Sequence, residues 1–261
     1  MQRYVNVRRD EEHAAPTTVQ REIAALRRMF RLGYKVTPPK VGQLPSFPEL
    51  TVQNSRSGFF EHDEFERLRK ELPGHLRPLV TVAYWLGWRL NELLGLQWRQ
   101  VNLDRGTVSL DAGSTKNGEG RLAYLPPEAL GVLKEWREQT TAIERERGII
   151  VANVFHKDGQ AVRDFRAAWA GACKRAMLTG RLFHDFRRTA ARNYRRQGVS
   201  EGVVMKIGGW KTRAVFDRYD IKNEADLREA AAMVGAPIGK NWERTGTVKP
   251  LRASGKARRA S

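Results

Sequence analysis

Apolar residues recur at intervals of three and four along most of the chain, which predicts a mainly helical protein. The pattern is clear at residues 17–35, where Ile23, Leu26 and Phe30 share one face and Thr17 or Thr18 can cap the start. Further helices are expected at about 61–71, 75–87, 89–96, 127–147, 160–178, 183–197, 200–208, 212–219 and 224–234.

Two short segments break the helical pattern. Residues 107–111 and 121–125 have strand composition, and the stretch between them is rich in glycine and contains Asn117-Gly118. Asn-Gly between strand segments is a strong hairpin signal. The expected fold class is therefore mainly α with a small antiparallel β-sheet or hairpin, an α+β protein.

The chain divides into three expected regions. Residues 36–57 carry four prolines and no apolar period, so we expect a linker that ends an N-terminal region of about residues 1–50. A compact domain is expected over about residues 55–236. Residues 237–261 are basic and lack an apolar pattern, which is typical of a disordered tail.

Charge narrows the class of partner. The chain has 47 Lys and Arg against 29 Asp and Glu, a net charge of +18. Such an excess favours nucleic acid first and an anionic membrane second. No run of about 18 apolar residues predicts a membrane span. The single cysteine, Cys173, excludes an internal disulfide, and a cytoplasmic location is expected.

Two basic residues stand where they could meet a phosphate. Arg89 and Glu92 lie three apart on an expected buried helix, so the carboxylate can orient the guanidinium. Taken alone, this pair favours an internal salt bridge. Lys116 lies at the tip of the expected hairpin, where a lysine is most often simply solvated.

The segment Phe183–Arg196 has one apolar and one basic face at helical spacing. The basic face, expected to contact DNA, consists of Arg188, Arg192 and Arg195. His184 and Arg187 fall on the seam between the two faces, where a side chain can be held by the core and still reach a phosphate. A neutral histidine can accept or give a proton, although a lone histidine is more often structural.

A last segment, residues 207–220, contains an aromatic pair. Trp210 follows two glycines that should end a helix, and alone it favours core packing. Tyr219 follows Asp217 and Arg218, so its hydroxyl is expected to face outward or into a cleft. Lys211 and Arg213 are further candidate DNA contacts.

In this combination and order, the segments resemble the tyrosine recombinase (phage integrase) family over about residues 15–235. The resemblance rests on Gly-Trp-Arg89-Leu-Asn-Glu92, Thr-Lys116-Asn, His184-Asp-Phe-Arg187, Trp210 at a position where His is commoner, and Phe-Asp-Arg-Tyr219. It implies the DNA breaking-rejoining fold of these catalytic domains.

The resemblance also implies a mechanism. Tyr219 would attack a DNA phosphate to give a 3′-phosphotyrosine, and Arg89 and Arg187 would stabilise the transition state. Lys116 would protonate the leaving oxygen, His184 would assist the nucleophile, and Trp210 would donate a hydrogen bond. No cofactor is expected, neither metal nor ATP, and the sequence contains no P-loop or zinc-ligand spacing.

The implied partner is double-stranded DNA, bound by a homotetramer when two sites are synapsed, with accessory DNA-bending or directionality factors. The family carries a core-binding domain of several helices ahead of the catalytic domain. Here only the helix at 17–35 is expected to correspond to it, which suggests a remnant. Three alternatives stay open: type IB topoisomerase-like relaxation, a non-catalytic DNA-binding remnant, and a basic module for RNA or membrane.

Overall fold

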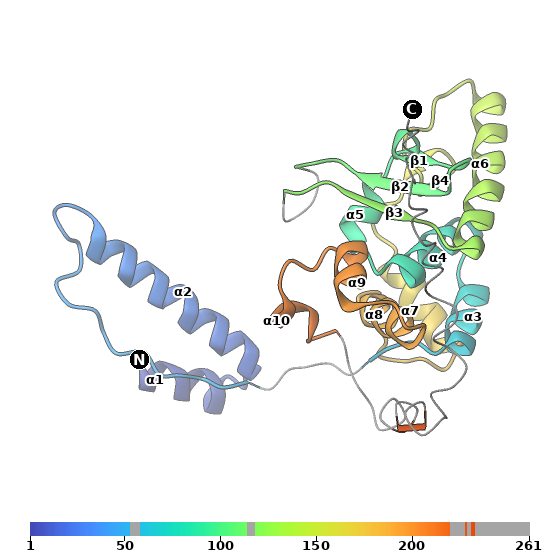
Figure 1. Cartoon of the computed structure of the whole chain (residues 1–261). Coiled ribbons are helices and arrows are strands. Elements are labelled where there is room, and N and C mark those ends of the chain that lie inside the picture. The colour runs from blue at the N-terminus through green and yellow to red at the C-terminus, as the bar shows by residue number, and fades with distance from the viewer. Residues whose placement is uncertain (53–57, 114–117, 220–227, 229–230, 233–261) are drawn as a thin grey trace, which may run out of the picture. The chain divides into compact units, whose positions relative to one another are not determined.

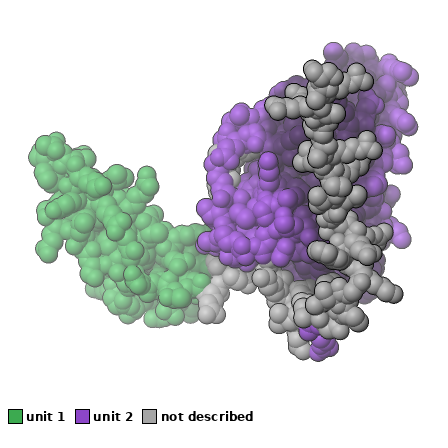
Figure 2. Space-filling model, in the orientation of Figure 1, with its two compact units in different colours: residues 1–57 green, residues 58–261 purple. Residues whose placement is uncertain are grey.

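The computed structural model describes residues 1–52, 58–113, 118–219, 228 and 231–232. It contains two compact units, residues 1–57 and residues 58–261, which we call the N-terminal and C-terminal units (Figure 2). Lys116 and the tail from residue 237 lie outside the described residues, as does nearly all of the helix expected at 224–234.

The N-terminal unit consists of helix α1 (Gln2–Asn6), a π-helical turn η1 (Val7–Glu11) and the long helix α2 (Pro16–Lys35). Its small core contains Val5, Val19 and Ile23. The described part of the proline-rich segment, residues 36–52, contains no helix or strand, but it differs from a free linker because Phe47 and Leu50 pack against this core. Arg8 and Glu22 form a bidentate ion pair between η1 and α2.

The C-terminal unit is built around helix α4 (Arg77–Leu86), which is buried over most of its length. Helices α3 (His62–Glu71), α6 (Pro127–Arg147) and α8 (Asp185–Arg196) pack against it, and α7 (Arg166–Arg175) packs against α3 (Figure 1). Aromatic rings fill the space between α3, α4 and α8, including Phe65 stacked on Tyr84 with centroids 4.0 Å apart. This core fixes the start of α8, where two proposed site residues lie.

A small antiparallel sheet has the order β1-β2-β3. Its strands are β1 (Val101–Asn102), β2 (Thr107–Leu110) and β3 (Arg121–Tyr124), with Leu110 opposite Arg121 at the end of the β2–β3 hairpin. Alternation along β3 buries Ala123 and exposes Leu122 and Tyr124. The expected hairpin and the expected fold class are confirmed.

The remaining short elements frame the site. Helix α5 (Leu90–Leu94) follows α4, helix α9 (Glu201–Gly208) follows α8, and the short helix α10 (Arg213–Phe216) precedes Tyr219. Two 3₁₀ turns, η2 (Gly74–Leu76) and η3 (Trp98–Gln100), join longer elements. Helix α9 contacts both α8 and strand β3, so the hairpin is anchored beside the Tyr219 segment.

The helix expected at 160–178 is wrong in its first part. Residues 160–161 instead form strand β5 (Gln160–Ala161), which pairs with β4 (His156–Lys157) in a second hairpin, and α7 begins only at Arg166. Asp158 and Gly159 have φ of 53° and 87°, as a type I′ turn requires, and Asp-Gly is a preferred sequence for that turn. Among the described residues, no helix is long and apolar enough to cross a membrane.

Candidate active site

Arg89 caps the start of α5, two residues after the left-handed Gly87 that ends α4. The Glu92 carboxylate accepts hydrogen bonds from the Arg89 backbone N–H (3.0 Å) and from its Nη1 (2.9 Å). Burial alone would raise the pKa of Glu92, but the hydrogen bond from the Arg89 backbone, the charge of Arg121 and the hydrogen bonds from both arginine side chains outweigh it, so the pKa is lowered. Glu92 is therefore ionised and fixes Arg89.

Arg187 lies on α8 and is only 2% exposed. Its Nη1 donates to the carbonyl oxygens of Gly87 (2.7 Å) and Gly208 (2.9 Å), at the ends of α4 and α9. Its Nη2 is buried without a hydrogen-bond partner among the described residues. Burial, together with the charge of Arg89, lowers the pKa of Arg187 to about 10, which leaves it protonated at neutral pH.

Trp210 follows α9, whose end is turned by Gly209 in the left-handed conformation (φ 70°). The ring is 5% exposed and covers the Arg187 guanidinium, with Cζ 4.2 Å from the ring centroid. Its Nε1 is also buried, and no acceptor for it exists in the part of the chain that the structure describes. The indole thus packs in a core, as one reading of the sequence expects, and still keeps a free donor.

Tyr219 lies in a turn just after α10, shorter than the helix expected at 212–219. Its hydroxyl is 3.2 Å from Nε2 of His184, at the start of α8, and the Arg187 Cζ lies 5.3 Å from its ring centroid. His184 is exposed, yet protein atoms desolvate its ring. This desolvation and the charges of Arg187 and Arg188 lower its pKa, so the ring is neutral near pH 7.

The predicted site residues that the structure describes lie close together, as their contacts and the effects of their charges on one another's pKa show. They are Arg89, Glu92, His184, Arg187, Trp210 and Tyr219. Lys116 lies outside the described residues, so its place in this group stays a prediction. Among the described residues, no three His, Cys, Asp or Glu side chains form a group that could hold a metal ion.

The expected basic face of α8 needs correction, because two of its three arginines are interior. Arg188 is 8% exposed and pairs with Asp185. Arg192 is 4% exposed and pairs with Glu61. The segment around Phe60 and Glu61 covers Arg192, so this arginine secures the fold, and we no longer expect it to contact DNA. The Arg188 Cζ lies 5.6 Å from the Tyr219 ring centroid, and a role for Arg188 in DNA binding stays a prediction.

The other candidate DNA contacts are more exposed but also carry ion pairs. Arg195 donates to the Val199 carbonyl and pairs with Glu201, and Arg213 pairs with Glu201 and Asp217. Lys211 pairs with Glu119 at 2.9 Å, beside the β2–β3 hairpin. Their role in DNA binding stays a prediction.

Sequence reasoning missed Arg121, the first residue of β3. Its side chain is 7% exposed, and it approaches Glu92 at 3.4 Å. The alternation of side chains along a strand could have indicated this, because it puts Arg121 on the same face as the inward-facing Ala123. A cavity of about 480 Å³ adjoins this residue, lined among others by Arg121, Gly209 and Trp210.

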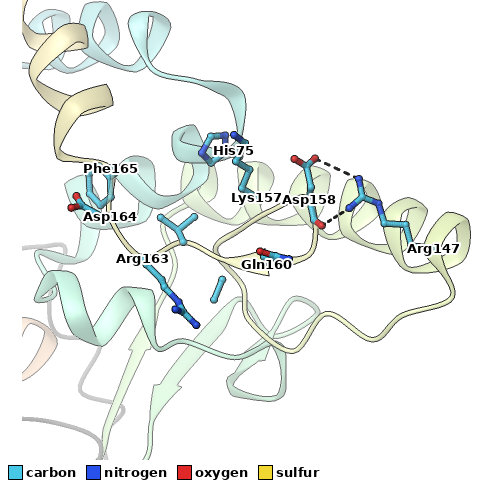
Figure 3. Close-up of a pocket in the computed structure, with 10 residues that line it drawn as sticks. His75, Arg147, Lys157, Asp158, Gln160, Arg163, Asp164 and Phe165 are labelled. Atoms are coloured by element: carbon cyan, nitrogen blue, oxygen red, sulfur yellow. Dashed lines mark hydrogen bonds and ion pairs between the residues drawn. The ribbon is translucent and has the colours of Figure 1, made fainter.

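A second cavity, of about 920 Å³, opens beside the β4–β5 hairpin (Figure 3). Its lining residues include His75, Lys157 and Arg163, and Arg147 donates to the Asp158 carbonyl oxygen at 2.8 Å. None of the predicted site residues lines it.

The helical core, the small sheet and the Arg-His-Arg-Trp-Tyr cluster define a DNA breaking-rejoining catalytic domain in fold. Among solved structures, the Tn1549 transposon integrase in complex with circular intermediate DNA is similar with a TM-score of 0.65 at 13% identity, covering 87% of this chain and 82% of that one. The XerA recombinase has a TM-score of 0.58 at 18% identity, with 90% and 82% covered. At these identities the likeness supports the fold.

The model of the phage integrase family matches residues 58–225. The chain therefore belongs to the phage integrase family, the tyrosine recombinases. The integrase of Salmonella phage P22 is 25% identical over 198 residues, which are 72% of this chain and 49% of that protein. The chain spans about half the length of the first curated relatives that it matches.

Proposed function

We propose that the protein is a site-specific DNA recombinase, or integrase, that cuts and rejoins DNA through a 3′-phosphotyrosine on Tyr219. The observation that carries the proposal is the contact between the Tyr219 hydroxyl and His184, 3.2 Å apart, beside Arg187 and Trp210. A phenol held by a neutral imidazole and surrounded by cationic donors is suited to attack a phosphate.

Two buried donors without partners support a phosphate at this place. Nη2 of Arg187 and Nε1 of Trp210 donate no hydrogen bond to any described residue. Leaving a buried donor unpaired costs roughly 1–3 kcal/mol, and a non-bridging phosphate oxygen would remove that cost. Arg89, oriented by Glu92, would bind the same phosphate. Preorganised donors of this kind act most strongly as charge develops in the transition state.

The proposed step balances as a transesterification. The Tyr219 oxygen forms a bond to phosphorus, the bond to the 5′ oxygen breaks, and a 5′ hydroxyl leaves. His184 would take the proton from Tyr219, and Lys116 would give one to the leaving oxygen, the latter on the resemblance alone. The phosphotyrosine keeps the energy of the broken bond, so the proposed step uses neither metal nor ATP. The reverse attack by a 5′ hydroxyl rejoins the strand.

The proposed partner is double-stranded DNA, in keeping with the net charge of +18. The Tn1549 neighbour is a DNA complex, which supports this choice. Assembly into a tetramer on synapsed sites, the accessory factors, and a cytoplasmic, nucleoid-associated location belong to the same proposal. So does the assignment of α2 as the last helix of a core-binding domain.

A nicked suicide DNA substrate tests the function. Because the released fragment diffuses away, wild-type protein should accumulate a covalent protein–DNA adduct, and Tyr219→Phe should form none. Absence of an adduct with wild-type protein, together with retained DNA binding, would support the non-catalytic remnant instead. Exchange of strands between two sites, rather than relaxation of supercoils alone, would separate recombination from a topoisomerase-like activity.

A further inference from the structure

Arg121 joins three parts of the site that are far apart in sequence. Its terminal nitrogens lie 3.4 Å from the two carboxylate oxygens of Glu92, and its Cζ lies 5.3 Å from the Trp88 ring centroid. The same carboxylate accepts the closer hydrogen bonds from Arg89. Glu92 is thus held between two arginines, one from α5 and one from β3.

The guanidinium of Arg121 also packs against the turn that leads into Trp210. A Cβ added to Gly209 would overlap the Arg121 guanidinium, so a side chain at this position would displace it. Trp88 fixes the same turn through Nε1, which donates to the Ile207 carbonyl at 2.8 Å. Strand β3 is thereby fastened to the end of α9.

The position of Arg121 suits it to hold Glu92 in place better than to bind a phosphate directly. The side chain is 7% exposed, and both terminal nitrogens face Glu92. Its charge nevertheless acts on its neighbours, since it helps to lower the pKa of Glu92 and adds to the positive field around Arg187. Without it, Glu92 would keep a single cationic partner and could rotate away from the geometry that orients Arg89.

We propose that Arg121 is a positioning residue for strand cleavage, which holds the Glu92 carboxylate so that Arg89 faces the phosphate. The inference rests on the proposed function. It adds a specific dependence: Arg121 acts through Glu92, not through its own contact with DNA.

A double-mutant cycle tests this dependence by single-turnover cleavage at saturating DNA. Arg121→Gln should slow cleavage about 10²-fold, the effect typical of a misplacement near 1 Å, while DNA affinity changes less than about threefold. In a Glu92→Gln background the same change should slow cleavage less than about threefold, because the residue through which it acts is already disabled. If Arg121 merely supports the fold, its replacement should slow cleavage by the same factor in the wild-type and the Glu92→Gln backgrounds.

Arg99→Gln is the matched control, because Arg99 pairs with Asp111 at 2.7 Å near the same sheet but is 67% exposed. It should leave the cleavage rate unchanged. If Arg121→Gln does not fold, Arg121→Lys makes the same test with an expected slowing of about tenfold. An Arg121 variant that cleaves at the wild-type rate, or effects that multiply, would overturn the inference and leave the function standing. Wild-type protein that forms no adduct would overturn the function itself.

Discussion

Replacing Arg192 by alanine should destabilise the C-terminal unit and leave DNA affinity nearly unchanged. Arg192 donates to the Phe60 carbonyl (3.1 Å), pairs with Glu61 (2.8 Å) and lies 3.8 Å from the Phe59 ring centroid. Loss of the buried carbonyl's donor costs about 1–3 kcal/mol, and loss of the cation–π contact about 1 kcal/mol. The Glu61 pair adds about 0.5 kcal/mol, because that carboxylate is 48% exposed.

Together these losses predict a decrease of about 3 kcal/mol in the free energy of unfolding, or roughly 6–12 °C in the melting temperature of a unit of this size. Urea unfolding and DNA binding by fluorescence anisotropy measure the two effects separately. Arg67→Ala is the control, since Arg67 pairs with Asp63 on the surface of α3, and it should change stability by less than about 0.5 kcal/mol. Unchanged stability with a large loss of DNA affinity would restore Arg192 as a DNA contact and refute this account.

Three further outcomes are expected. The pKa of His184 is lowered from its usual 6.5, so the cleavage rate should stay constant from pH 8 to about 6.5 and fall only below that, as the ring becomes protonated. His184→Gln should remove this fall in rate at acid pH, and an unchanged pH profile in the variant would exclude His184 as the base. Trp210→Phe should lower the melting temperature by about 2–4 °C, because the smaller ring leaves a gap in a buried site, and should slow cleavage roughly 10- to 100-fold, because the N–H donor is lost. The same loss of stability with cleavage at the wild-type rate would make Trp210 purely structural. The logarithm of the DNA association constant should fall linearly with the logarithm of salt concentration, and affinity that does not depend on salt would contradict phosphate binding.

The helices, the hairpin and most of the site follow from local sequence patterns. Arg89 and Glu92 are three apart, and the structure pairs them, because that spacing fixes proximity on a helix. His184 and Arg187 both lie beside Tyr219, although Arg187 is buried and not at a solvent-facing seam. Local periodicity carries this information because the helical repeat is constant.

The errors have a common physical origin in tertiary packing. Spacing predicts that Arg188 and Arg192 share a face, but it cannot say that the segment at Phe60 and Glu61 covers Arg192. Arg121 was missed for a similar reason, since its partner Glu92 is 29 residues away in sequence. The helix expected from residue 160 failed because a local Asp158-Gly159 turn outweighs the apolar pattern around it.

Mass spectrometry of the protein–DNA adduct tests the central claim most directly. After digestion of the protein and the DNA, the account predicts a nucleotide joined through its 3′ phosphate to Tyr219, and a free 5′ hydroxyl on the released strand. Tyr194, which packs with Ala191 and Val204 beside α9, should stay unmodified. A phosphate linked to another residue, or a 5′ rather than a 3′ linkage, would contradict the account.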